Sequence, residues 1–181
     1  MKKLFILLLV ITLFIQCQSN QIHLIQKNQV GLISNKTKVS DLDKIFAKDS
    51  LVKPHYEKNQ PKYLSEDYEV YSKKGAHLLT INIENDNDTT SIIQSVQIFS
   101  PLYKTKKEIS VNSVFKDLKG NYDLKKVTST ITAASVFVNE LNASFIITNK
   151  DLGLSEFSTK SVSLDQIPDN APFKYITVWL N

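Results

Sequence analysis

Segment 33–46 reads ISNKTKVSDLDKIF, and segment 109–122 reads ISVNSVFKDLKGNY. Aligned at a constant offset, the two segments share an isoleucine, a serine, an aspartate and a leucine. Similar residues face each other at three further positions: Thr37 and Ser113, Val39 and Phe115, Phe46 and Tyr122. The chain therefore carries one pattern twice, and each copy predicts the same local structure.

Each copy is typical of a strand end followed by a short helix. Thr37 and Ser113 suit a helix N-cap, because their hydroxyl oxygens can accept a free backbone N–H. Asp41 and Asp117 then fall in the first turn, where the helix dipole favours a carboxylate. One apolar stripe completes each helix, made of Val39, Leu42 and Phe46 or of Phe115, Leu118 and Tyr122. Two explanations stay open, namely a tandem duplication and two unrelated capped helices.

The segments that follow each helix favour β-strands. The predicted strands are 67–73, 76–84, 91–99, 127–132, 143–148 and 173–180, with a helical turn at 136–141 and a loop over 149–172. In the second of these, Leu79, Ile81 and Ile83 alternate with polar residues, which indicates one buried face. The order predicts an α+β fold in which an antiparallel sheet accompanies two short helices. We expect a single α+β domain over 31–181, with 31–100 and 107–181 as candidate repeat units.

The T-x-x-x-D-L helix opening followed by a strand meander resembles a group of small exported bacterial proteins. This group is typified by the BamE/SmpA outer-membrane lipoproteins and by the beta-lactamase inhibitor protein, in which the unit is tandem. The resemblance covers 33–99 and, less closely, 109–148. Lys36 and Asn112 stand where that group usually has glycine, and the paired cysteines of its inhibitor branch are missing. The resemblance implies binding or scaffolding in the cell envelope and carries over no binding residue.

The N-terminus has the order of an export signal. Lys2 and Lys3 precede an apolar run over 4–15, which is shorter than the roughly twenty residues that a membrane-spanning helix needs. Cys17 follows, as the lipidated cysteine of a bacterial lipoprotein does, although Gln16 stands where a small residue is usual. We therefore expect a signal peptide over 1–16, lipidation of Cys17 and a tether over 17–30. The alternative is cleavage after Ser19 and a soluble secreted or periplasmic product.

Cys17 is the single cysteine of the chain, so it has no disulfide partner. Lipidation would remove an unpaired thiol from an oxidising compartment, which favours the lipoprotein interpretation. The predicted location is the bacterial envelope, periplasmic or at the cell surface. The predicted partners are the membrane, reached through the lipid anchor, and an unidentified envelope protein.

The charge pattern argues against nucleic acid as a partner. All 22 basic residues are lysine, so the arginine that reads phosphate and guanine is missing. Without Lys2 and Lys3, 20 lysines face 18 acidic residues, which leaves a net charge of only +2. A surface of this kind does not predict a polyanion-binding protein.

No catalytic pattern emerges from the residues that could carry chemistry. His23, His55 and His77 lack metal-ligand spacing, and the acidic run 84–88 fails the glycine and glutamate positions of a calcium loop. Two S-x-x-K matches, Ser50–Lys53 and Ser113–Lys116, lack the companion motifs of penicillin-binding enzymes. We expect no enzyme, no metal and no cofactor. An enzyme with an unrecognised site would need a pocket that joins His55 or His77 to carboxylates.

Two further groups of residues allow a binding role. Lysines at 104, 106, 107, 125 and 126 would form a basic patch if their loops converged, or else lie on solvated loops. Phe173, Tyr175 and Trp179 would form a sugar-stacking platform if exposed, or a core stripe if covered. The expected function is a non-catalytic binding or scaffolding lipoprotein, and the alternative is a soluble inhibitor or immunity-type protein.

Overall fold

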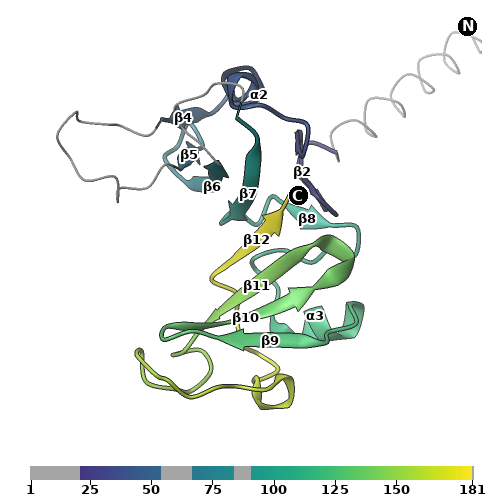
Figure 1. The fold of residues 1–181 in the computed structure, drawn as a ribbon, viewed down its shortest axis with the longest axis vertical. Helices are drawn as coiled ribbons and strands as arrows, with labels where there is room; N and C mark the ends of the chain where they lie inside the picture. The colour runs from purple at the N-terminus through teal and green to yellow at the C-terminus, as the bar shows by residue number, and fades with distance from the viewer. Residues whose placement is uncertain (1–20, 54–66, 84–90, 181) are drawn as a thin grey trace, which may run out of the picture.

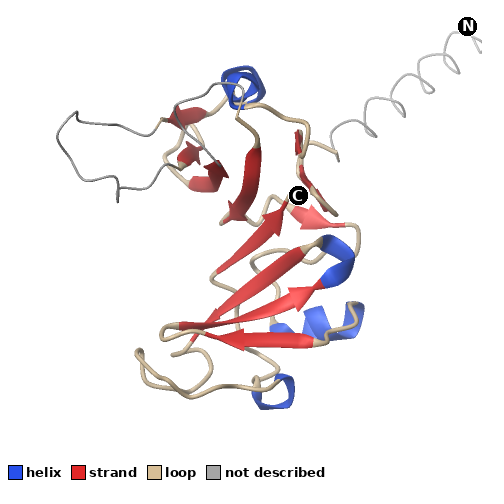
Figure 2. Cartoon of the chain, in the orientation of Figure 1, coloured by secondary structure: helices blue, strands red, loops and turns tan. Residues whose placement is uncertain are grey.

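The computed structural model describes residues 21–53, 67–83 and 91–180. The fold is mixed α+β and mostly β, with two short α-helices and two sheets (Figures 1 and 2). The larger sheet has eight strands, and every neighbouring pair in it is antiparallel. Across the sheet the strands are β4 (Ser50–Val52), β5 (Tyr68–Tyr71), β6 (His77–Ile83), β7 (Ile93–Ile98), β12 (Tyr175–Trp179), β11 (Ala143–Thr148), β10 (Ala133–Val138) and β9 (Lys126–Ser129).

The smaller sheet lies near the start of the described chain. Its four strands, in order, are β3 (Ile33–Ser34), β2 (Gln29–Val30), β1 (Leu24–Gln26) and β8 (Lys104–Thr105). Ile25 and Val30 are buried in it, so residues 21–30, for which the sequence predicts a tether, are part of the fold. At Gly31 the φ of +56° and a would-be Cβ only 2.2 Å from the Ile22 carbonyl oxygen leave room for glycine alone.

The larger sheet has two halves, each with one helix. The first half contains β4–β7 and α2 (Leu42–Ile45), which follows the 3-10 helix η1 (Val39–Asp41). The second half contains β9–β12 and α3 (Phe115–Asn121). The two halves meet where β7 pairs with β12, with Gln97 opposite Thr177.

The same backbone hydrogen bonds connect each helix to its own half. The Val39 N–H donates to the Ser91 carbonyl oxygen at 3.2 Å, just before β7. In the second half the Phe115 N–H donates to the Ala171 carbonyl oxygen at 3.0 Å, shortly before β12. Each helix is thereby held against the chain that leads into the strand by which its half pairs with the other half.

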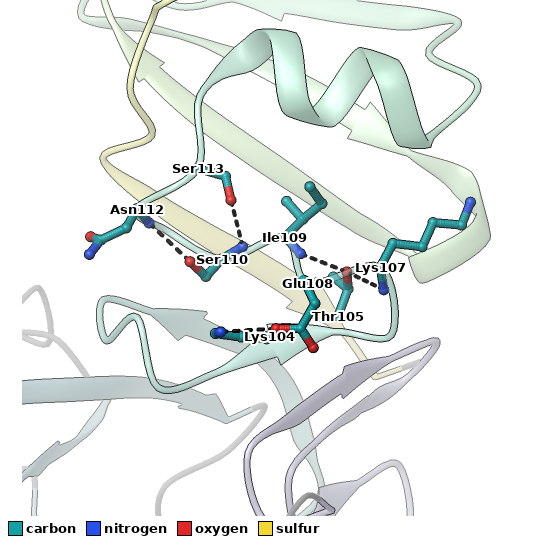
Figure 3. A network of polar contacts seen from close by, with 8 residues as sticks. All are labelled: Lys104, Thr105, Lys107, Glu108, Ile109, Ser110, Asn112 and Ser113. Carbon is teal, nitrogen blue, oxygen red and sulfur yellow. Dashed lines mark hydrogen bonds and ion pairs between the residues drawn. The ribbon is translucent and has the colours of Figure 1, made fainter.

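The hydroxyls predicted to cap the helices have a different role. Ser113 Oγ accepts from the Ser110 N–H at 3.1 Å (Figure 3), and Thr37 Oγ1 accepts from the Ser34 N–H at 2.9 Å. Both bonds close the turn before the helix. The prediction of N-caps at these positions is therefore wrong by one residue, because each helix begins after Lys38 or Val114. The repeated sequence pattern therefore encodes a hydroxyl-closed turn followed directly by a helix start.

A row of apolar side chains crosses all eight strands on the face that forms the core. Cα pairings connect its members in the order Leu51, Val70, Leu79, Ile98, Ile176, Phe145, Val136 and Val127. They pack in one cluster with the helix residues Leu42, Phe46, Phe115, Leu118 and Tyr122. Burial of this apolar surface is the main force that holds helices and sheet together.

Most predicted strands are present, and one predicted element is wrong. The expected strands near β5, β6, β7, β9, β11 and β12 are all confirmed. The helical turn expected over 136–141 is strand up to Val138, and only η2 (Asn139–Leu141) is helical. Val136, Phe137 and Val138 suit a strand because branched and aromatic side chains pack well on a pleated sheet. The predicted loop over 149–172 contains the short η3 (Leu164–Gln166).

Among the described residues, none of the helices has the length and apolar character needed to cross a bilayer.

Candidate binding face of the sheet

The second face of the larger sheet carries polar and aromatic side chains. Cα pairings connect a row next to the apolar one, in the order Val52, Glu69, Thr80, Gln97, Thr177, Ser144, Phe137 and Lys126. Because successive side chains of a strand point to opposite faces, this row lies opposite the core. The face that carries this row we call the open face; it also carries Tyr71, His77, Phe99, Tyr175 and Trp179.

Four rings form a continuous aromatic row on the open face, beginning with three stacked rings in the first half. The ring centroids of Tyr71 and His77 lie 4.9 Å apart, and those of His77 and Phe99 lie 4.2 Å apart with an interplanar angle of 20°. The Phe99 ring then packs at a tilt against Tyr175 of β12, with centroids 5.4 Å apart, so the aromatic row crosses the boundary between the halves. Each ring is half-buried, so part of each remains accessible.

A second aromatic pair occupies the other half. The Phe137 and Trp179 rings stack with centroids 5.9 Å apart and planes inclined by 15°. Lys126 Nζ lies 5.0 Å from the Phe137 centroid, so an ammonium group also lies over this ring. The aromatic groups of the two halves thus frame the centre of the sheet.

Small polar side chains form the floor between the two aromatic groups. Thr80, Thr177 and Ser144 belong to this floor and are only 8%, 8% and 1% exposed, because larger neighbours shield them. Every buried side-chain nitrogen or oxygen of the described residues has a hydrogen-bond partner, so the floor is internally satisfied. At the centre of the open face, the groups available to a ligand are therefore ring edges and the half-exposed Gln97 amide.

The stacking geometry bears on which ligand this face suits. A sugar stacks on a free aromatic face, but in the stack the ring faces are turned toward each other. Mixed aromatic and amide surfaces of this kind are typical of protein interfaces, where Tyr and Trp are enriched. Phe173 does not belong to the face at all, because its ring packs edge-on against Phe145 in the core at 4.9 Å. Of the predicted aromatic stripe, only Tyr175 and Trp179 lie on the open face.

His77 is part of the sheet and not of a reactive centre. Its Nε2 makes hydrogen bonds with the Leu79 carbonyl oxygen at 3.1 Å and with Thr80 Oγ1 at 3.0 Å. Beside it, the Tyr71 hydroxyl donates to Glu69 Oε2 at 2.7 Å, and this bond raises the pKa of Tyr71. The described part of the chain contains no group of three or more His, Cys, Asp or Glu that could hold a metal ion.

The remaining sequence candidates are scattered. His23 packs edge-on against Tyr103 with ring centroids 5.0 Å apart. Ser113 of one S-x-x-K match accepts a backbone hydrogen bond, and Lys53 of the other pairs with Asp43 at 2.8 Å. Cys17, His55 and the acidic run 84–88 lie outside the described residues.

Most of the five lysines considered as a basic patch have local partners. Lys104 pairs with Glu108 at 2.9 Å (Figure 3), and Lys125 pairs with Asp123 at 3.0 Å. Lys107 donates to the Asn121 carbonyl oxygen at 2.6 Å and lies 3.4 Å from Glu140 Oε2. With Lys106 it lines a cleft of about 290 Å³ beside β1. Their charge is thus largely balanced within the fold.

Comparison with known proteins supports the fold alone. No protein-family model matches the chain, and no curated protein matches it. A solved structure, that of the uncharacterized protein yfeY from Escherichia coli, is similar with a TM-score of 0.53. The match covers 87% of this chain and 98% of that chain at 15% sequence identity. At this identity the likeness concerns the arrangement of strands and helices and says nothing of a ligand.

Proposed function

We propose that the chain is an exported bacterial lipoprotein, anchored through Cys17, whose open face binds a protein partner in the cell envelope. Export and anchoring are supported by the sequence, in which Lys2 and Lys3 precede an apolar run that ends just before a single cysteine. A lipid anchor would hold firmly only with more than one acyl chain, as bacterial lipoproteins carry.

The binding role rests on one observation, the composition of the open face. A sheet face exposed to water usually carries charged and small polar residues, whereas this one carries the rings of Tyr71, Phe99, Tyr175 and Trp179. Rigid aromatic side chains lose little entropy when a partner covers them, which makes them common anchors of interfaces. Glu69 toward one edge and Lys126 on the other edge strand would add charge selectivity.

The role is proposed as non-catalytic because the described residues offer no reactive grouping. His77 is held by hydrogen bonds within its strand and between two rings. The cleft beside β1 contains Tyr122, Glu140 and lysines but no histidine, serine or cysteine. These residues favour binding over nucleophilic or acid–base chemistry.

We also infer that the two halves are tandem copies of one helix-plus-sheet unit. Helix-to-strand bonds recur at matching positions, as do the Lys38 and Val114 N–H groups that donate to Asp41 and Asp117 at 3.0 Å. The halves join through their last strands around the Gln97–Thr177 pair. Independent helices would not be expected to share the turn, the helix start and the strand pairing together.

Metabolic labelling with a fatty acid tests the anchor. The full chain carries a C-terminal tag and is expressed in a bacterium that processes lipoproteins, beside Cys17→Ala. Label in the wild type alone is the expected result. A soluble unlabelled product that begins near Asn20 would contradict the anchor and favour the alternative, a secreted inhibitor or immunity-type protein. Gln16, beside the cleavage site of a lipoprotein, is the residue that motivates this alternative.

Photo-crosslinking tests the open face directly. A crosslinking amino acid replaces Gln97 at the centre of the face, and a matched variant carries it at Lys160, an exposed loop residue. We expect one discrete crosslinked envelope protein from position 97 that is lost when Trp179→Ala is added. Identical products from both positions, or none from position 97, would contradict binding by this face.

A further inference from the structure

Three large aliphatic side chains are exposed together where the described chain begins. Ile22, Leu32 and Leu102 are 46%, 53% and 57% exposed, and we call them the anchor-side patch. Ile22 and Leu32 line one small hollow together with Tyr103, the residue after Leu102. The parallel pairing of Leu24 with Lys104 also runs back toward Ile22 and Leu102.

The patch is built from three separate segments of the chain. Ile22 precedes β1, Leu32 follows Gly31 in the turn between β2 and β3, and Leu102 lies in the turn before β8. Gly31 fixes that turn, since its positive φ and its contact with Ile22 admit no side chain. Only seven large apolar side chains are exposed among the described residues, so three in one place form a distinct patch.

Covalent geometry places this patch next to the proposed lipid. Ile22 lies five positions after Cys17 in the chain. Five residue steps span at most about 18 Å when fully extended. Two other exposed apolar residues, Ile131 and Phe157, are neighbours through the bond from the Ser158 N–H to the Ile131 carbonyl oxygen. They belong to loops near β9 and β10, at the opposite end of the molecule from β2 (Figure 1).

We propose that the anchor-side patch rests on the membrane that holds the Cys17 lipid, with the three aliphatic side chains in its interfacial layer. This inference rests on the proposed lipidation of Cys17 and adds which surface faces the bilayer. Aliphatic side chains gain free energy when they leave water for the acyl boundary, and a short link raises their local concentration there. In this orientation the smaller sheet is the part of the molecule nearest the membrane.

Fluorescence quenching by brominated lipids tests the orientation. The full processed chain, with Leu32→Cys or Leu102→Cys, is labelled with an environment-sensitive thiol dye. It is reconstituted into vesicles of phosphatidylethanolamine and phosphatidylglycerol, with and without brominated acyl chains. Phe157→Cys, 70% exposed at the other end, is the matched control. We expect a blue shift and a loss of fluorescence at positions 32 and 102 and neither at 157.

Two results would overturn the proposal in distinguishable ways. Equal quenching at all three positions, or none at 32 and 102, would show that the patch does not face the bilayer although the chain is anchored. Because Cys17 is the single native cysteine, an acylated wild type has no thiol for the dye. Dye uptake by the wild type, without recovery on vesicles, would instead show that the anchor itself is wrong.

Discussion

The two halves of the larger sheet share a backbone framework and differ in the side chains they expose. On the core face, matching places carry apolar residues in both halves, as with Val70 and Val136. One residue earlier in each strand, on the open face, the matching residues are Glu69 and Ser135, an acid and a small hydroxyl side chain. Core packing restricts which residues fit at the Val70 and Val136 positions. The open-face positions point outward, so their residues can differ and can contact a ligand.

The comparison extends to the helices. In the first half, η1 and the four-residue α2 form the helical segment, while α3 has seven residues. Leu42 and Leu118 are nevertheless both fully buried at the same place in the pattern. The difference in helix length is therefore tolerated as long as the apolar stripe reaches the core.

The largest expected effect concerns this shared stripe. Leu42→Ala and Leu118→Ala should each lower the free energy of unfolding by about 2–5 kcal/mol, since each leaves a cavity in a closely packed core. Both halves contribute to one cluster, so unfolding in urea should remain a single transition in both variants. Lys116→Ala, on the exposed side of α3, is the control and should change little. Two separate transitions would show that the halves are independent units.

A smaller effect is expected at the helix starts. Asp41 and Asp117 each accept a backbone N–H at 3.0 Å and lie at the positive end of a helix dipole. Replacement by alanine should cost about 1 kcal/mol at either position, because the bond is exposed and water can partly replace it. Differential scanning calorimetry would measure both variants. A loss of stability in only one of the two variants would show that the two helix starts are not equivalent.

The repeated segment allowed both helices to be predicted because it combines two signals. An aspartate in the first turn and an apolar stripe at i, i+3 and i+7 together restrict the chain more than either alone. The N-cap prediction for Thr37 and Ser113 is wrong, because a hydroxyl side chain four residues before the aspartate suits a helix cap and a turn equally well. Local sequence does not distinguish the two, because the partner N–H lies upstream in one case and downstream in the other.

The elements that the sequence missed are mostly two- or three-residue strands. Strands β1, β2 and β8 carry too few residues for a period of two to be visible, and the pairing of β1 with β8 joins distant segments. The open face was predicted only in part, through Tyr175 and Trp179. The Tyr71, His77 and Phe99 rings come together through strand pairing, which the sequence leaves undetermined.

Gly120 sharpens the comparison, because the aligned residue of the first half is Lys44. Gly120 lies within α3 without a positive φ, and nothing would touch an added Cβ. Gly120→Ala should therefore stabilise the protein by about 0.5–1 kcal/mol, through the lower entropy of its unfolded chain. Lys44→Ala is the matched control and should alter the midpoint of thermal unfolding very little. Destabilisation by Gly120→Ala would mean that this position contacts a partner or bends the helix.

The smallest expected effect is electrostatic, at aligned positions of opposite charge. Asp43 pairs with Lys53 in the first half, whereas Lys119 pairs with Asp169 in the second. The Lys119 ammonium lowers the pKa of the Asp169 carboxyl below its ordinary value. A lowered pKa in the folded state stabilises the protein above the pKa of the unfolded chain. That small contribution is lost as the pH falls through the folded-state pKa.

Carboxyl-detected NMR titration of the wild type and Lys119→Met measures this contribution. We expect the pKa of Asp169 to return toward its ordinary value in the variant, because the ammonium partner is gone. Asp165 is the internal control, since the Ser163 hydroxyl lowers its pKa and should continue to do so. The pair ties α3 to the loop before β12, as does the bond from the Lys116 N–H to the Asp169 carbonyl oxygen at 2.8 Å. If the pKa of Asp169 stayed low without Lys119, the nearby Lys116 ammonium and not the Lys119 ion pair would set it.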